Sequence, residues 1–234
     1  MNYLPLALPF FAGLFLLFVF LVLVIELRIV QFAYERIGVS PRYMLALLLL
    51  SFLGSYVNIT VAHLPPEHVH SNEVISFFGM HYVVPVVREW PGTVIAVNVG
   101  GAVVPTLVSA YLILKNRLFL SGVAAVVVVT LVVHGMAYPV PGVGIAVPIF
   151  IPPLIAALAG VVFARRRAAP LAYVAGSLGT LIGADLLNLD KVRGLGAPIA
   201  SIGGAGKFDG IFLSGLIGVL LASLVGRPRR RRTS

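Results

Sequence analysis

The sequence has no cysteine and little charge. None of its 234 residues is Cys, and Asp, Glu, Lys and Arg together make up only 11% of them. The lack of cysteine excludes disulfides, thiolate metal sites and cysteine nucleophiles. A soluble domain of this length carries about 25% charged residues. The low charge, together with a hydrophobic share of 59%, therefore predicts an integral membrane protein.

The net charge is +9, but its distribution does not indicate a nucleic-acid partner. Most of the cations lie in three places beside hydrophobic runs: residues 28–42, residues 165–167 and the tail that begins at Arg227. Basic clusters in such positions are typical of topology determinants and of contacts with anionic headgroups. We therefore expect membrane lipids, and no nucleic acid, as partners.

Several hydrophobic runs are long enough to cross a bilayer, which takes about 20 apolar residues. We predict an all-α integral membrane protein of about seven transmembrane helices, forming one polytopic domain over residues 1–226 with an outer loop at 63–91. A basic cytoplasmic tail follows at 227–234. The first run has no basic residues before it and is long for a signal-peptide core, so we expect a retained anchor. The seven runs cover residues 5–27, 43–62, 92–114, 118–138, 144–164, 170–189 and 208–226.

The Lys and Arg residues predict the orientation of these spans. With seven spans, thirteen of the 17 cations fall on one side and four on the other, namely Arg88, Lys191, Arg193 and Lys207. The richer side is expected in the cytoplasm. This places the N-terminus outside and the C-terminus inside the cell membrane. It also gathers all five histidines at the outer face, where we expect a polar site.

The hairpin between the last two spans carries the strongest candidate site. Asp185 lies inside the end of one span, Asp209 lies at the start of the next, and an uncharged Gly-rich stretch separates Arg193 from Lys207. Carboxylates at membrane depth are costly and usually functional. A Gly-rich connection can re-enter the protein if its backbone groups are satisfied there. We expect a re-entrant-like hairpin whose glycines Gly203, Gly204 and Gly206 contact substrate or water.

Three interpretations of the two aspartates remain open. In the first, Asp185 and Asp209 share a proton and act as an acid–base pair that activates water against an amide. In the second, Asp209 caps a helix and Asp185 pairs with a lysine or an asparagine, as in a noncatalytic lipid-binding or scaffold membrane protein. In the third, Asp185 binds a proton or cation for transport. A P-loop is excluded because Gly206-Lys207 is followed by Phe208.

Interrupted helices point to the same face. The third run opens with Asn98, Gly100 and Gly101, and the fifth contains Pro152-Pro153. Broken helices at matching depths are typical of substrate or ion sites. We expect these residues, together with Asn58 at the end of the second run, to bind a substrate such as a transmembrane peptide. The sequence specifies neither the identity of that substrate nor an oligomeric state.

The outer loop contains histidines at metal-ligand spacing. His68 and His70 could coordinate together, with His63, Glu67 or Glu73 completing the set. No HExxH pattern is present. We assign no metal and no cofactor from the sequence, and the site at these histidines stays an open alternative.

Two resemblances cover much of the chain. Residues 195–223 (LGAPIASIGGAGKFDGIFLSGLIGVLLAS) and 54–60 (GSYVNIT) resemble a prokaryotic family of multi-pass membrane proteins described only as a domain of unknown function. That resemblance implies a multi-pass membrane protein and does not point to an activity.

The second resemblance is to presenilins and signal peptide peptidases, which are intramembrane aspartyl proteases. Residues 98–114 (NVGGAVVPTLVSAYLIL) are similar to their Gly-x-Gly-Asp helix, Tyr56-Val57-Asn58 looks like their Tyr-Asp helix, and Pro152-Pro153-Leu154 is similar to their Pro-Ala-Leu motif. Gly101 stands where the catalytic aspartate would be, and the Tyr-Asp acid is also missing. The resemblance implies a protease-like fold in which Asp185 and Asp209 would have to supply the chemistry.

Overall fold

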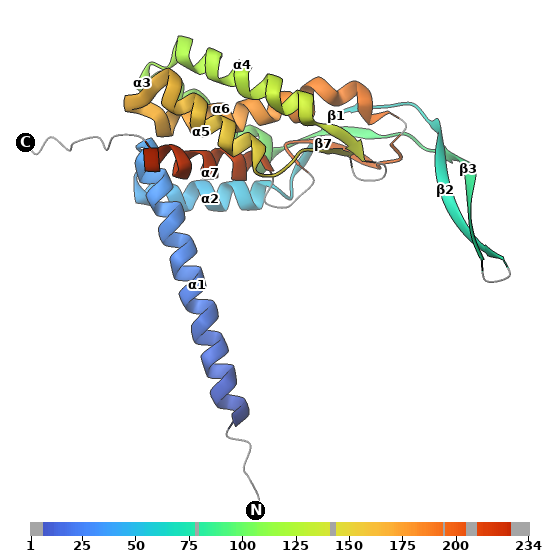
Figure 1. Ribbon diagram of the computed structural model, residues 1–234, viewed down its shortest axis with the longest axis horizontal. Coiled ribbons are helices and arrows are strands. Elements are labelled where there is room, and N and C mark those ends of the chain that lie inside the picture. The colour runs from blue at the N-terminus through green and yellow to red at the C-terminus, as the bar shows by residue number, and fades with distance from the viewer. Residues whose placement is uncertain (1–6, 78–79, 141–143, 194, 205–209, 226–234) are drawn as a thin grey trace, which may run out of the picture.

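A computed structural model describes residues 7–77, 80–140, 144–193, 195–204 and 210–225. It consists of a mostly helical body from which one long helix and one β-hairpin project (Figure 1). Seven α-helices account for most of the described residues: α1 (Ala7–Ile37), α2 (Pro41–Gly54), α3 (Val104–Asn116), α4 (Phe119–Met136), α5 (Ile151–Ala164), α6 (Ala168–Thr180) and α7 (Gly210–Val225).

Shorter helical turns extend or join these helices. The π-helical turns η1 (Val99–Val103) and η3 (Leu181–Asp185) precede α3 and follow α6, and the 3-10 turns are η2 (Arg165–Arg167) and η4 (Leu186–Val192). The strands are β1 (Asn58–His63), β2 (Glu67–Phe77), β3 (Met80–Trp90), β4 (Val94–Asn98), β5 (Tyr138–Val140), β6 (Gly144–Ala146) and β7 (Ile199–Ile202).

Small residues bring the central helices together. A Cβ added at Gly160 on α5 would meet the backbone and side chain of Ala172, and one added at Gly176 on α6 would meet the Ser214 carbonyl on α7. Close approach through glycine and alanine is how helices associate in lipid, where apolar burial gives little drive. The α5–α6 pair folds back at η2, so that Ala156 and Ala159 share a core cluster with Leu171 and Ala175.

Four helical segments are long and apolar enough to cross a membrane. They are Phe11–Ile37, Val99–Asn116, Phe119–Met136 and Ile151–Val192, and the last comprises two helices because the chain turns back at η2. The apolar helices Arg42–Gly54 and Gly210–Val225 are shorter. The protein is therefore a mostly helical protein with the character of a membrane protein.

Helix α1 has two different parts. From Phe11 to Ile29 it is almost entirely exposed and apolar, and it projects away from the body (Figure 1). Its last turns contribute Ala33, Tyr34 and Ile37 to the largest core cluster, where Tyr34 is 2% exposed. The helix continues past residue 27, the predicted end of the first span, because these later apolar residues pack against α6 and α7.

We expect Tyr34→Ala to lower the free energy of unfolding by about 3 kcal/mol, since it leaves a large cavity in a packed cluster. Phe18→Ala on the same helix removes a ring that is 63% exposed and should change stability by less than about 0.5 kcal/mol. Thermal unfolding of the detergent-solubilised protein compares the two variants. Equal losses in both would contradict the assignment of Tyr34 to the core.

The prediction of an all-α fold needs one correction, because three apolar stretches pair as strands. Strand β4 lies between β1 and β7; it is antiparallel to β1, with Asn58 opposite Asn98, and parallel to β7. The predicted spans 43–62, 92–114 and 144–164 therefore lose residues 58–62, 94–98 and 144–146 to strands. Strand pairing satisfies the backbone groups of these β-branched segments between neighbours.

The predicted outer loop 63–91 contains a long hairpin. Strands β2 and β3 pair antiparallel from Glu67 opposite Trp90 to Phe77 opposite Met80. The hairpin extends well beyond the helical body (Figure 1). Its base is tied to the three-stranded sheet, because the Leu64 amide donates to the Thr93 carbonyl at 2.9 Å.

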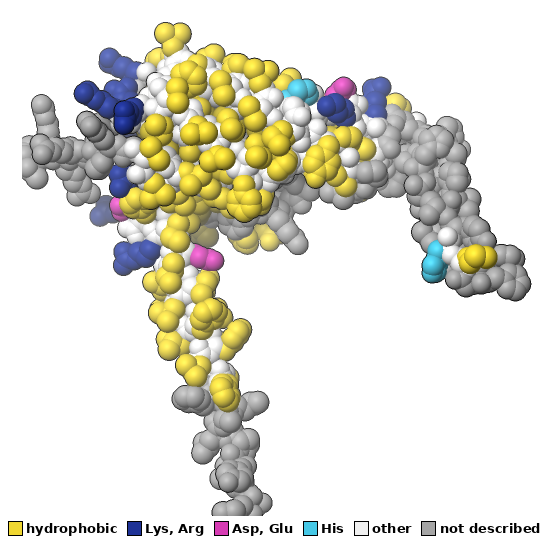
Figure 2. Space-filling view, in the orientation of Figure 1, with side chains coloured by type: hydrophobic (Ala, Val, Ile, Leu, Met, Phe, Trp, Pro, Cys, Tyr) yellow, Lys and Arg dark blue, Asp and Glu magenta, His cyan; other side chains and the backbone are white. Residues whose placement is uncertain are grey.

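Charged side chains are concentrated at the two ends of the helical body. The cations of the α1 end, the α3–α4 turn and η2 gather at the end from which α1 leaves (Figure 2). Asp190 and Lys191 belong to η4, which lines a pocket together with strand β7 of the sheet. The cations of the first group are Arg36, Arg42, Lys115, Arg117, Arg165, Arg166 and Arg167.

Candidate functional site

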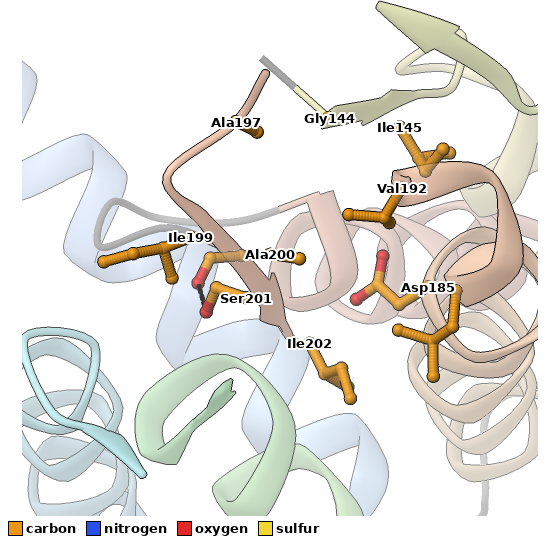
Figure 3. Close-up of a pocket in the computed structure, with 11 residues that line it drawn as sticks. Gly144, Ile145, Asp185, Val192, Ala197, Ile199, Ala200, Ser201 and Ile202 are labelled. Atoms are coloured by element: carbon orange, nitrogen blue, oxygen red, sulfur yellow. Dashed lines mark hydrogen bonds between the residues drawn. The ribbon is translucent and has the colours of Figure 1, made fainter. Parts of the chain in front are cut away.

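A pocket of about 290 Å³ lies between the end of α6 and strand β7. Its walls come from η3 and η4 on one side, from β7 on the other, and from Gly144 and Ile145 of β6. The carboxylate of Asp185 points into the space between Val192 and β7 (Figure 3). The pocket thus combines one acidic side chain with mostly apolar walls, which is the usual composition of a small binding site.

Asp185 lies at the last residue of the π-helical turn η3. A Cβ added at Gly183 in the same turn would come within 2.6 Å of the Thr130 carbonyl, so η3 and α4 are in close contact there. Asn188 donates to the carbonyls of Gly183 and Ala184 at 2.8 and 2.9 Å, so its buried side chain is bonded to the backbone of the π turn. Turns of this kind occur frequently at functional sites.

The Gly-rich segment is held against Asp185. The amide of Gly203 donates to the Oδ2 atom of Asp185 at 2.7 Å, across 18 residues of sequence. A hydrogen bond from a backbone N–H to a charged carboxylate is stronger than a neutral one. Gly203 has φ +90°, a conformation that disfavours any other residue. The end of β7 and the end of η3 are therefore joined at the pocket.

A second polar cluster lies beside the pocket, at the junction of β4 and η1. The side chain of Asn98 is fully buried; its Nδ2 donates to the Ser55 carbonyl at 2.7 Å and to Asn58 Oδ1 at 3.1 Å. Its Oδ1 accepts from the Gly101 amide at 2.8 Å, as a helix N-cap does. The hydroxyl of Ser201 on β7 lies 2.8 Å from Asn58 Oδ1. The cluster links all three strands of the sheet.

Two adjacent glycines allow the backbone to pass through this junction. A Cβ at Gly100 would overlap the Ser51 carbonyl oxygen on α2, and a Cβ at Gly101 would overlap the Gly203 carbonyl oxygen. The Ser51 hydroxyl donates to the Gly100 carbonyl at 2.7 Å. The turn η1 is therefore packed between α2 and the Gly-rich segment, with no space for a side chain at either glycine.

The structure brings together some of the residues that the sequence proposed and separates others. Asp185 and Gly204 line the pocket, and Gly203 bonds to Asp185. Pro152 and Pro153 are buried at the start of α5, where the Pro153 carbonyl lies near Gly218 of α7, and neither lines the pocket. Asn58, Asn98, Gly100 and Gly101 form the adjacent junction. Asp209 and Gly206 lie outside the described residues.

Sequence reasoning missed the two serines that complete the site. Ser201 lines the pocket and approaches Asn58, and Ser51 bonds to Gly100 from α2. Both are single hydroxyls within apolar stretches. Their only signal was their position in the sequence: Ser201 lies two residues before Gly203, and Ser51 lies about one helical turn before Gly54.

No metal cluster is found where side chains are described. Among those residues, no group of three His, Asp or Glu side chains could hold a metal ion. The side chains of residues 67–79 and 82–90, which include His68 and His70, are not among them.

The comparisons with known proteins assign a family. Residues 52–221 match the family described as "Protein of unknown function (DUF1614)". The chain belongs to the DUF1614 family. The match begins on α2 and ends on α7, so the DUF1614 region includes the pocket, the β4–η1 junction and the hairpin but not the projecting part of α1. The expected membership in a family of unknown function is confirmed.

No curated protein and no solved structure matches this DUF1614 chain. The resemblance to presenilins and signal peptide peptidases therefore stays a prediction based on sequence motifs. Within the structure, the stretches that carry it, Tyr56-Val57-Asn58 and Gly100-Gly101, meet through Asn98. Asn58 and Gly101 supply amide groups at that junction, and neither residue carries a carboxylate.

Proposed function

We propose that this DUF1614 protein is an intramembrane diaspartyl-protease-like protein that uses Asp185 and Asp209 as its acid–base pair. The observation that carries the proposal is the hydrogen bond from Gly203 to Asp185. It ties the segment that leads to Asp209 directly to the Asp185 carboxylate.

Packing on both flanks of residues 205–209 supports the same proposal. Ile211, two residues after Asp209, shares an apolar cluster with Leu181, which lies four residues before Asp185. Ile202, on the other flank, packs against that cluster. The described residues on both sides of this segment thus lie beside η3, and the six Cα–Cα steps from Gly204 to Gly210 span at most about 20 Å when extended.

The proposed chemistry is hydrolysis of an amide bond. One carboxylate takes a proton from water as the water oxygen attacks the carbonyl carbon, and the partner carboxyl gives its proton to the leaving nitrogen. The products are a carboxylic acid and an amine. Two carboxyl groups in one apolar site favour this division, because like charges so close cannot both ionise.

We propose a multi-pass arrangement in the cell membrane with seven spans, the N-terminus outside and the C-terminus in the cytoplasm. Support comes from the seven apolar α-helices, each of which overlaps one predicted run. The gathering of cations at one end of the body supports a cytoplasmic location for that end. The pocket and the hairpin would then face outward, where a transmembrane peptide could enter.

The test is cleavage of transmembrane peptides by the full chain in proteoliposomes. We expect Asp185→Asn and Asp209→Asn each to lower the cleavage rate at least about 100-fold, the usual scale of acid–base catalysis. Asn at position 185 retains an oxygen that can accept from Gly203, so the local fold should persist. Asp190→Asn, an exposed neighbour, is the matched control and should cleave at the native rate.

Three results would overturn the proposal. The first is a native protein that cleaves none of a panel of transmembrane peptides, and the second is native rates in both variants. The third is loss in Asp185→Asn alone, which would indicate a single-carboxylate site, as expected for a transporter or a proton-binding protein.

A further inference from the structure

We propose that the basic end of the helical body binds one anionic phospholipid by its phosphate group. This end is formed by the junction of α1 and α2, the turn between α3 and α4, and the 3-10 turn η2, and its cations gather where α1 leaves the body (Figure 2). The site is independent of the proposed hydrolysis at Asp185, and it holds one lipid in a defined place. We call it the basic face; its cations are Arg36, Arg42, Lys115, Arg117, Arg165, Arg166 and Arg167.

Two side chains join the three connections of the basic face. The Nζ atom of Lys115 donates to the Gly38 carbonyl at 2.7 Å and to the Tyr111 hydroxyl at 2.9 Å, and Arg167 donates to the Asn116 carbonyl. Gly38 follows α1 and Asn116 ends α3, so both cations cover carbonyls at helix C-termini, where the helix dipole is negative. The end of α3 is therefore bonded to the α1–α2 junction on one side and to η2 on the other.

These contacts leave N–H donors for a phosphate. Lys115 has three N–H groups, of which its bonds to Gly38 and Tyr111 use two. Arg36 lies over the ring of Phe32, with its guanidinium carbon 4.6 Å from the ring centroid. A guanidinium presents five N–H donors in a planar fork that fits phosphate oxygens. The cations of the basic face can therefore bind an anion without giving up the bonds that join the helices.

Three helices begin at the same face. Helix α2 starts at Pro41, α4 at Phe119 and α6 at Ala168, and the residue before each makes no side-chain capping bond. The first turns of these three helices contain no Asp or Glu. A helix N-terminus carries partial positive charge and N–H groups that suit an anion. The three helix starts thus add to the positive potential that the seven cations create.

Exposed apolar side chains beside the cations favour a lipid over a soluble anion. Leu120, three residues after Arg117, is 88% exposed, and Val162, three residues before Arg165, is 73% exposed. A lipid meets the cations with its phosphate and these side chains with its acyl chains, whereas a soluble anion leaves the apolar side chains in water. Anionic lipids make the cytoplasmic leaflet negative and attract basic segments beside membrane helices. The combination of charge and apolar surface therefore fits an anionic phospholipid.

The experiment is native mass spectrometry of the full chain, purified in detergent and stripped of lipid, with phosphatidylglycerol added. We expect one phosphatidylglycerol per chain to stay bound at concentrations where phosphatidylcholine with the same acyl chains does not. The double variant Arg165→Gln, Arg166→Gln should raise the Kd at least tenfold, because two cations of the face are lost. The double variant Lys191→Gln, Arg193→Gln is the matched control. It removes the same charge from exposed side chains outside the basic face, so it should bind lipid as the native chain does.

Thermal unfolding in detergent gives a second readout, because a ligand of the folded chain raises its melting temperature. Phosphatidylglycerol should raise the melting temperature of the native chain and of the control, but far less that of the Arg165→Gln, Arg166→Gln variant. A second pair, Arg42→Gln with Arg117→Gln, should weaken binding in the same way, so the result does not depend on η2 alone. Native melting of each variant without lipid shows that the chain is folded.

Three results would overturn the proposal. Equal retention of phosphatidylglycerol and phosphatidylcholine would show that the face does not select for charge. Native affinity in both double variants of the basic face would leave these arginines with a role in membrane topology alone. An equal rise in melting temperature with inorganic phosphate at the same concentration would identify a free anion, and not a lipid, as the ligand.

Discussion

Replacing Gly101 with alanine is expected to destabilise the protein by at least about 3 kcal/mol, at or above the upper range for overpacking a core. The added Cβ would overlap the Gly203 carbonyl oxygen and come within 3.4 Å of Asn98 Oδ1. The Gly203 amide is bonded to Asp185 and Asn98 Oδ1 is bonded to the Gly101 amide, so a shift of either residue would disturb a hydrogen bond of the site. Thermal unfolding in detergent measures the loss.

Gly135→Ala is the control for Gly101→Ala. It adds the same methyl group at the end of α4, where no heavy atom lies within 4 Å. Its melting temperature should stay near the native value. A Gly101→Ala protein as stable as Gly135→Ala would show that η1 and the Gly-rich segment are not in contact, and the description of the site would be wrong.

Replacing Asn98 with alanine is the second change with a large expected effect, about 3–4 kcal/mol. Two buried partners, the Ser55 carbonyl and the Gly101 amide, lose their bond, whereas the exposed Asn58 keeps the bond that its Oδ1 accepts from Ser201. An N-cap is worth about 1 kcal/mol, and each unsatisfied buried group costs about 1–3 kcal/mol. The same thermal assay applies.

Asn98→Asp divides this effect into two parts. An aspartate at position 98 can still accept from the Gly101 amide, but it cannot donate to Ser55 or Asn58. We expect a stability between that of the native chain and that of Asn98→Ala. If Asn98→Asp proves as unstable as Asn98→Ala, a capping role for this side chain is contradicted.

The sequence predicted the apolar helices more successfully than the segments between them. Each predicted run overlaps one of the helices α1–α7, because a long apolar run is a strong signal. It missed the strands at residues 58–63, 94–98 and 199–202, since a short apolar segment fits a strand or a helix equally well. Only pairing across distant segments, β4 with β1 and β7, decides between the two.

For the candidate site, the sequence indicated the region but not the contacts. Because the sequence contains few charged residues, Asp185 within an apolar run indicated a polar site. The glycine cluster indicated that backbone segments approach closely, and the structure shows such close approaches at Gly100, Gly101 and Gly203. One partner of Asp185 in the structure is the backbone amide of Gly203, a contact that a sequence cannot specify.

The most direct test of the central claim is cross-linking between positions 185 and 209. The chain has no cysteine of its own, so the double variant Asp185→Cys, Asp209→Cys can be treated with an oxidant or a short bifunctional thiol reagent without background. Trypsin then cleaves after Lys191, Arg193 and Lys207, and fragments that stay joined report the link. A disulfide requires Cα atoms about 4.4–6.8 Å apart.

We expect the Asp185→Cys, Asp209→Cys pair to cross-link rapidly within one chain. The control pair, Asp190→Cys with Asp209→Cys, should react far more slowly because Asp190 is exposed and does not line the pocket. Cross-linking of the 185–209 pair no faster than the control would separate the two aspartates and contradict a shared acid–base site.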